Sequence, residues 1–355
     1  MIGERIKRAR RAAGLSQREL ALAADLSPMA VSKFEAGTIT PASDTLLRLA
    51  RALQVRVEFL LRPGALQLEA PEYRKRSSLG KKKLASIEAD VLDQVERFQE
   101  LLHLYPSPPI VSFGLPAGLP TLVSAYDELE AVALLMREVW QLGYSAIPSL
   151  ADTLEERGLL VLTTPQAGDG VFDGLAAKVG DLPVIVVGAS WPGDRQRFTM
   201  AHELGHLVLA GRLASSLDAE KACNRFAGAF LAPEPAVRAE LGPVRHRFEP
   251  RELHTLKQRY GLSMLAWVFR ARNLGIASEA IVDATFRRFS AAGWRKLEPG
   301  GPVPPETPRL FEQLVMRALA EDMLSESKAA ELLRLRTSDF RERLALEGLD
   351  GADRP

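Results

Sequence analysis

The sequence has a single cysteine, Cys223, among its 355 residues. One cysteine cannot form an internal disulfide, and it excludes a cysteine-rich zinc site. The sequence also lacks a run of about 18 uncharged apolar residues, so no membrane-spanning helix is expected. Its first residues, MIGERIKRARR, lack the apolar segment of a secretory signal peptide. We therefore expect a cytoplasmic protein that does not bind a membrane.

A large net charge is also missing, because the formal value is only +1. The charge is nevertheless uneven. Residues 1–83 contain 17 Lys or Arg and 8 Asp or Glu, which gives +9, and the remaining residues carry −8. The N-terminal part is thus the candidate for binding a polyanion. The hydrophobic fraction of 46% is ample for the cores of two or three globular domains.

The first sixty residues predict five short helices. Ser16 and Glu19 form a capping box at the start of one of them. Ser27 caps the next helix, with Pro28 at its first position and Gly37 just past its end. Two short helices joined by a tight turn are typical of a helix-turn-helix.

This segment resembles the Xre family of phage-repressor-like DNA-binding domains. The residues that carry the resemblance are Gln17, Leu20, Ala21, Ser27, Val31, Ser32, Glu35, Gly37, Pro41, Leu46, Leu49, Ala50 and Leu53. The resemblance implies that the third helix reads DNA, usually through Gln, Asn or Arg near its start. Pro28, Met29 and Ala30 occupy those positions here, so we expect mainly phosphate contacts and weak sequence readout.

The expected nucleic-acid contacts come from this bundle and from a basic run that follows it. The segment 73–83, YRKRSSLGKKK, holds six Lys or Arg and no acid, and it is either a solvated linker or a phosphate-binding segment. The alternative for the bundle is that it binds only protein. The predicted contacts are Arg5, Arg8, Gln17, Arg18, Ser27, Met29, Ser32, Lys33, Arg74, Lys75, Arg76, Lys81, Lys82 and Lys83.

The middle of the chain predicts a small sheet followed by a long helix. A helix of about five turns is expected from Leu84, and amphipathic helices over 125–140 and within 148–158. The short apolar runs 159–163 and 183–188, with DGLAAKV between them, have the lengths and β-branched content of strands. The helix that follows contains TMAHELGHLVLA, residues 199–210.

His202 and His206 lie one helical turn apart on one face, close enough to hold one metal ion. Two hydrogen-bonded helix histidines are the alternative. A catalytic zinc site has three protein ligands and an open fourth position. Glu220, in the first turn of the next helix, can point across at both histidines, whereas Asp218 and Cys223 are weaker candidates and Glu234 lies beyond that helix.

These segments are similar to the ImmA/IrrE family of zinc metallopeptidases. The similarity covers WPGDRQRF, TMAHELGHLVL, EKACNRFAGAFLAP and YGLSMLAWVFRARNLGI. It implies that the glutamate of the second helix, in an E-x-x-A-N context, completes the zinc site, as in thermolysin-like peptidases. Here Cys223 stands where the family has alanine or serine, which we expect to be neutral for packing.

The expected mechanism follows from the ion. Glu203 is the predicted general base, and zinc is the expected ion, with manganese as the alternative because a two-histidine, one-glutamate site accepts either. The residue that assists at the oxyanion is not evident. His246, His254 and Tyr260 are candidates, each with a packing or surface role as the alternative.

The expected fold class is α+β and mostly helical. We expect a five-helix helix-turn-helix bundle over 1–62 and a basic linker with a connecting helix over 63–112. A thermolysin-like (gluzincin) peptidase domain with a small sheet is predicted over 113–284, and a helical region over 285–355. We expect the last region to dock on the peptidase or to mediate a homodimer.

Two functions are compatible with this pattern. The first is a zinc metalloendopeptidase that cleaves an Xre-type repressor in a stress or DNA-damage response, gated by single- or double-stranded DNA of low sequence specificity. The second is a DNA-binding transcription regulator or antitoxin-like protein whose zinc domain is a sensor or dimerisation module. Glu203 favours catalysis, because a structural zinc site needs no general base and normally has no open position.

Overall fold

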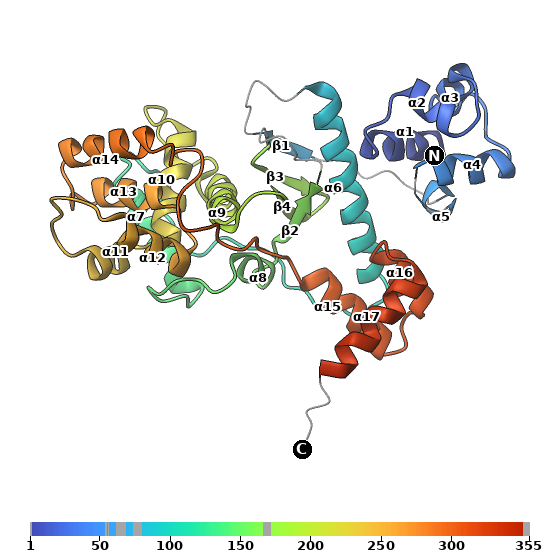
Figure 1. Ribbon diagram of the computed structural model, residues 1–355. Helices are drawn as coiled ribbons and strands as arrows, with labels where there is room; N and C mark the ends of the chain where they lie inside the picture. The colour runs from blue at the N-terminus through green and yellow to red at the C-terminus, as the bar shows by residue number, and fades with distance from the viewer. Residues whose placement is uncertain are drawn as a thin grey trace. The chain divides into compact units, whose positions relative to one another are not determined.

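The computed structural model describes residues 2–53, 55, 57–61, 69–73, 80–165 and 172–350 (Figure 1). The chain divides into two compact units that interleave along the sequence. Unit 1 comprises Met1–Leu68, Gly80–Val111 and Pro308–Pro355, and unit 2 comprises Glu69–Leu79 and Ser112–Thr307. As the sequence predicted, the fold is mostly helical with a small sheet. Among the described residues, no helix is long and apolar enough to cross a membrane.

The N-terminal part of unit 1 is the expected five-helix bundle. The Ser16 hydroxyl accepts from the Glu19 amide and the Glu19 carboxylate accepts from the Ser16 amide, so the predicted capping box is present. Ser27 caps the third helix by accepting from the Ala30 amide. The helices are α1 (Ile2–Ala12), α2 (Gln17–Ala23), α3 (Pro28–Glu35), α4 (Ser43–Leu53) and α5 (Val57–Leu61).

Apolar side chains from all five helices meet in one core that includes Ile6, Leu20, Val31 and Leu49. Arg10 lies beside this core and forms a two-pronged ion pair with Glu35 of α3, at 2.5 and 2.9 Å. Gln17 donates to the same carboxylate at 2.8 Å. Buried Glu35 therefore joins the ends of α1, α2 and α3 through charge-assisted hydrogen bonds.

The long helix α6 (Lys81–Leu102) packs against α1. Its Glu96 accepts hydrogen bonds from both Arg5 and Arg8, and the side chain of Arg5 is only 4% exposed. Their placement differs from the phosphate contacts that we expected, because both guanidinium groups face an internal carboxylate. The partner lies about ninety residues away in the sequence, so local patterns could not reveal it.

The C-terminal helices complete unit 1. They are α15 (Leu310–Ala320), α16 (Glu326–Leu332) and α17 (Thr337–Asp350). The Tyr105 hydroxyl, just after α6, donates to the Leu314 carbonyl at 2.6 Å, and the Phe98 and Phe311 rings lie 6.2 Å apart. Residues 308–350 therefore pack with α6 in unit 1, whereas from the sequence we expect all of 285–355 to dock on the peptidase or to mediate a homodimer.

Unit 2 contains a four-stranded mixed sheet in the order β1-β3-β4-β2. β2 and β4 are parallel, whereas β3 is antiparallel to both β4 and β1. β1 was not expected, because EAPEY has neither a β-branched run nor clear alternation. The strands are β1 (Glu69–Tyr73), β2 (Leu160–Thr164), β3 (Gly174–Val179) and β4 (Leu182–Gly188).

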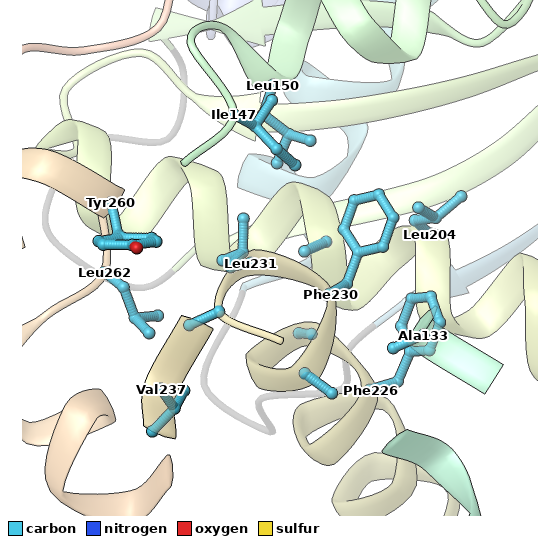
Figure 2. Packing of buried hydrophobic residues seen from close by; sticks show 14 of the residues in the cluster. Ala133, Ile147, Leu150, Leu204, Phe226, Phe230, Leu231, Val237, Tyr260 and Leu262 are labelled. Atoms are coloured by element: carbon cyan, nitrogen blue, oxygen red, sulfur yellow. The ribbon is translucent and has the colours of Figure 1, made fainter. Parts of the chain in front are cut away.

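The helices of unit 2 surround one large apolar core. Figure 2 shows part of it, where Leu204 of α9, Phe226 and Phe230 of α10 and Ala133 of α7 lie close together. The Phe226 and Phe230 rings stack 5.7 Å apart. The helices are α7 (Glu128–Val139), α8 (Leu150–Glu155), α9 (Gly193–Leu209), α10 (Ala219–Leu231), α11 (Glu234–Leu241), α12 (Pro250–Tyr260), α13 (Met264–Asn273) and α14 (Glu279–Ala291).

An extended segment over residues 298–306, here named the strap, ties several of these helices together. Glu298 accepts from the amides of Met264 and Leu265 at the start of α13, and from Lys257 at 2.9 Å. At the other end, Glu306 accepts from the amides of Leu150 and Ala151 at the start of α8. Each carboxylate thus accepts from N–H groups that have no acceptor within their own helix, at a terminus where negative charge is favoured.

The strap also holds the beginning of α9. The Gly193 amide donates to the Val303 carbonyl at 2.8 Å, and a Cβ at Gly193 would lie 2.0 Å from the Pro304 carbonyl oxygen. Arg197 of α9 forms an ion pair with Glu306. Residues 298–306 are therefore part of the packing of unit 2, although their proline-rich composition predicted only a connection.

Candidate metal centre

The site is built on α9, which follows directly from the central strand β4. α9 packs against β3 and β4, and the approach is close because Gly174 of β3 has no side chain. A Cβ there would lie 2.4 Å from Thr199 and 3.7 Å from Glu203. Only glycine lets the strand and the helix meet at this distance, so Thr199 and Glu203 both face the sheet.

The two histidines lie on a different face of α9, toward α10. His202 is fully buried, and the side chain of His206 is 12% exposed. Their Nε2 atoms are 3.1 Å apart. Glu220, in the first turn of α10, places one carboxylate oxygen 3.5 Å from Nε2 of His202 and the other 3.4 Å from Nε2 of His206. The structure thus brings together the three residues that the sequence predicted as ligands.

These separations fit a tetrahedral zinc site. Zinc binds histidine nitrogen and carboxylate oxygen at about 2.0–2.2 Å, so two ligand atoms of a tetrahedral site lie about 3.3–3.5 Å apart. The two Nε2 atoms are 3.1 Å apart and lie 3.5 and 3.4 Å from different oxygens of Glu220, and one ligand atom from each of the three residues lies within 4.8 Å of the others. Two imidazoles and one carboxylate also form the donor set of a catalytic zinc site with one open position. The residues present therefore fit the ion.

Asn224 of α10 determines how His202 faces this centre. The Asn224 amide oxygen lies 3.0 Å from Nδ1 of His202. Because that oxygen can only accept, Nδ1 carries the proton, and the lone pair of Nε2 faces the space between Glu220 and His206 that a metal ion would occupy. A fixed tautomer of this kind is how partners beyond the ligands orient metal-binding histidines. In the sequence, Asn224 belongs to the E-x-x-A-N context of the family, and that context does not reveal this role.

Glu203 is the neighbour of the first ligand, and it is fully buried. Its side chain lies on the sheet side of α9, next to Gly174, whereas the histidines face α10. A general base must come within hydrogen-bond reach of the proton that it accepts. The role predicted for Glu203 stays a prediction, and its position is compatible with that role.

The weaker ligand candidates have other partners. The Asp218 side chain caps α10 by accepting from the Lys221 amide at 2.8 Å. Cys223 is 1% exposed and packs against Gly205 of α9. A Cβ added at Gly205 would lie 3.3 Å from the Cβ atom of Cys223. Glu234 pairs with Arg238 at 2.7 Å.

The structure places the three oxyanion candidates in different surroundings. The Tyr260 hydroxyl donates to Glu240 at 2.9 Å, and burial raises the pKa of that hydroxyl. The His254 ring lies under the strap, next to Gly300, and His246 is exposed in the loop between α11 and α12. None of these contacts connects them with the metal ligands.

Comparison with known proteins agrees with both parts of this architecture. Residues 6–60 match the family model for a helix-turn-helix, and residues 154–272 match the model for an IrrE N-terminal-like domain. The second range contains His202, Glu203, His206 and Glu220. The chain joins a helix-turn-helix domain to an IrrE N-terminal-like domain. The predicted resemblance to these two families is confirmed.

One curated relative is the radiation response metalloprotease IrrE of Deinococcus radiodurans. It is 32% identical over 168 residues, which cover 42% of this chain and 48% of that protein. The aligned part therefore spans about half the length of the relative.

The predicted nucleic-acid contacts have different positions in the helix-turn-helix domain. Arg18 of α2 and Ser27, Met29, Ser32 and Lys33 of α3 are exposed, with Met29 at 67%. Gln17 donates to Glu35, and Arg5 and Arg8 face Glu96. Lys83 is half-buried in the first turn of α6. Arg74, Lys75 and Arg76 lie outside the described residues, as do the side chains of Lys81 and Lys82.

Proposed function

We propose that the chain is a zinc-dependent metalloendopeptidase. The observation that carries this proposal is the convergence of His202, His206 and Glu220, with the buried Glu203 next to the first ligand. The family match over residues 154–272 and the name of the relative, a metalloprotease, support it. A structural metal site would need no carboxylic acid at position 203, and it would normally be closed by a fourth ligand.

The chemistry divides between the ion and this chain's side chains. When bound, zinc supplies Lewis-acid chemistry that makes water more acidic and polarises a peptide carbonyl. The Glu203 carboxylate accepts a proton from the attacking water and delivers it to the leaving amine. His202, His206 and Glu220 hold the ion, and the Asn224 amide oxygen keeps His202 in the tautomer that binds it.

We further propose that the substrate is a regulatory protein of the cytoplasm, an Xre-type repressor, and that DNA gates its cleavage. The presence of a helix-turn-helix domain in the same chain supports this, because DNA can bring enzyme and repressor together. The relative is named for a radiation response, which supports a role in stress or DNA damage.

DNA binding itself is proposed to rest on phosphate contacts from α2 and α3. Arg18 and Lys33 are exposed there, and the apolar Pro28, Met29 and Ala30 lie at the start of α3. Without bidentate donors at these positions, we expect low sequence specificity and strong salt dependence.

The test is cleavage of Xre-type repressors by the purified zinc-loaded protein, with and without single- and double-stranded DNA. Glu203→Gln is the control, because it preserves shape and leaves the three ligands unchanged. We expect this variant to bind zinc with unchanged stoichiometry but to lose cleavage by at least about a hundredfold. Normal cleavage by Glu203→Gln would show that the assigned base is wrong.

The second candidate is a DNA-binding regulator whose metal domain acts as a sensor or dimerisation module. The helix-turn-helix match favours it. Absence of cleavage under all conditions, together with tight binding to one promoter sequence, would support the regulator over the peptidase. The same samples give the metal content after purification, which distinguishes zinc from manganese.

A further inference from the structure

A cavity of about 500 Å³ opens in unit 2 beside the metal centre. α9 and α10 run antiparallel, so that His206 lies opposite Glu220 and His202 opposite Asn224. One turn farther along, α9 carries Phe198 and α10 carries Gly228. Both of these residues and Asn224 line the cavity. The cavity therefore begins at the residue that hydrogen-bonds a metal ligand.

The absence of a side chain at Gly228 helps to keep this space open. A Cβ at Gly228 would lie 3.0 Å from the Cδ atom of Arg270, whose side chain runs across the glycine. The remaining wall includes three aromatic residues, which are Phe198 of α9, Phe269 of α13 and Tyr126 of the loop before α7. Phe269 is 39% exposed and its ring lies 4.8 Å from that of Phe286.

Four cationic side chains line the wall, and two of them, Arg270 and Arg225, are held by acceptors within the protein. Arg270 binds both oxygens of Glu130, at 2.6 and 2.8 Å, and also the Ala232 carbonyl. Arg225 forms ion pairs with Glu130 and Asp127, each at 3.0 Å. These two guanidinium groups are already paired, Arg272 lies 4.0 Å from Glu279 and the Lys221 side chain is exposed, so among the described residues the cavity has no unpaired buried cation. Its free surface is mostly aromatic and aliphatic, which selects an apolar occupant.

We propose that this cavity binds a bulky apolar side chain of the polypeptide substrate next to the cleaved bond, and thereby selects the cleavage site. The inference rests on the proposed peptidase function. The volume lies within the range of pockets that enclose a large side chain or a small ligand. Asn224 lines the cavity and its amide oxygen lies 3.0 Å from Nδ1 of the ligand His202, so a side chain seated here would hold the substrate backbone close to the metal centre.

The first test profiles cleavage of a proteome-derived peptide library by the zinc-loaded full chain. We expect large apolar residues at one position adjacent to the cleaved bond. Ala266 of α13 lines the cavity, so Ala266→Phe should shift that position toward small residues and leave the others unchanged. Ala239→Phe, an exposed alanine of α11 that does not line the cavity, is the matched control and should retain the original preference.

The second test does not depend on cleavage. Two peptide hydroxamates, one with a benzyl and one with a methyl side chain, are titrated into the zinc-loaded protein by calorimetry. We expect the benzyl compound to bind at least about tenfold more tightly. Ala266→Phe should remove the difference while the methyl compound still binds, and Phe269→Ala should reduce it if Ala266→Phe fails to fold.

The two experiments separate the two proposals. Absence of all cleavage, with the benzyl preference intact, would contradict the peptidase and leave the apolar subsite standing. Cleavage without any apolar preference, equal binding of the two hydroxamates, or no binding of either would overturn the subsite.

Discussion

Asn224 contributes no ligand atom, yet its amide oxygen decides which nitrogen of His202 faces the metal centre. Without that acceptor, the buried imidazole can exchange its proton between the two nitrogens, and the lone pair is no longer aimed at the ion. The position of Asn224 on α10 thus affects how tightly His202 of α9 can bind the ion.

The substitution Asn224→Ala should weaken zinc binding by about 10- to 100-fold, because partners of metal-bound histidines have effects of this size. Asn224→Asp should recover most of the affinity, since a carboxylate oxygen accepts the same hydrogen bond. Competition with a zinc-binding dye measures both. Asn273→Ala, at the end of α13, is the control and should leave affinity unchanged.

At the residue scale, the sequence predicted what depends on local spacing. The serine caps at Ser16 and Ser27 act over three residues, and the histidines of α9 are one turn apart. The sequence could not predict that Arg5 and Arg8 turn toward Glu96, because that contact spans about ninety residues. Composition indicated a basic surface there, but the positive charges of Arg5 and Arg8 are paired with Glu96 inside the fold.

At the element scale, the strap is the feature that local patterns concealed. Its glycines and prolines predict a loop, but they do not indicate that its two glutamates lie at the starts of α8 and α13. β1 was missed for a related reason, since its pairing with β3 joins segments about one hundred residues apart. In both cases the stabilising partner is distant in sequence.

Removing the charge of Glu306 should destabilise unit 2. Glu306→Gln leaves the buried Arg197 without its ion-pair partner, which should lower the free energy of unfolding by about 3 kcal/mol. Urea unfolding followed by circular dichroism measures the effect. Glu279→Gln, whose 73% exposed side chain lies 4.0 Å from Arg272, should change it by less than about 0.5 kcal/mol. Equal effects of the two substitutions would contradict a structural role for the strap.

The second prediction at this scale concerns α3. Lys33→Ala should weaken DNA binding similarly for all sequences and reduce the slope of log affinity against log salt by about 1, because one phosphate contact is lost. Fluorescence anisotropy at several salt concentrations gives the slope. Arg295→Ala removes an exposed cation of unit 2 and should have no effect. A loss confined to one DNA sequence would instead indicate base readout by Lys33.

At the scale of the whole molecule, unit 2 is inserted into the sequence of unit 1 in two places, a short one over residues 69–79 and a long one over residues 112–307. The segments on either side of the long insertion, α6 with Tyr105 and α15 with Leu314, contact each other directly. Sequence patterns indicated which two domains are present, but not that one is inserted into the other. Local patterns do not show which segments far apart in the sequence pack together.

We therefore expect a variant in which residue 111 is joined to residue 308 by a short linker to remain helical, monodisperse and able to bind DNA as the full chain does. A fragment of residues 1–111 is the comparison. It should unfold at lower temperature, because the face of α6 that packs on Phe311 and Leu314 is exposed. If the joined variant aggregates while the fragment is stable, the C-terminal helices do not belong to the folding unit of the bundle.

The insertion of unit 2 into unit 1 also affects the genetics of this protein. A premature stop codon anywhere between residues 112 and 307 removes α15, α16 and α17 together with part of unit 2. Such an allele leaves the helix-turn-helix bundle without the helices that cover α6, so the part that it releases should be less stable than in the full chain. Truncating alleles should consequently weaken both units at once, and only an in-frame deletion can remove unit 2 without destabilising unit 1.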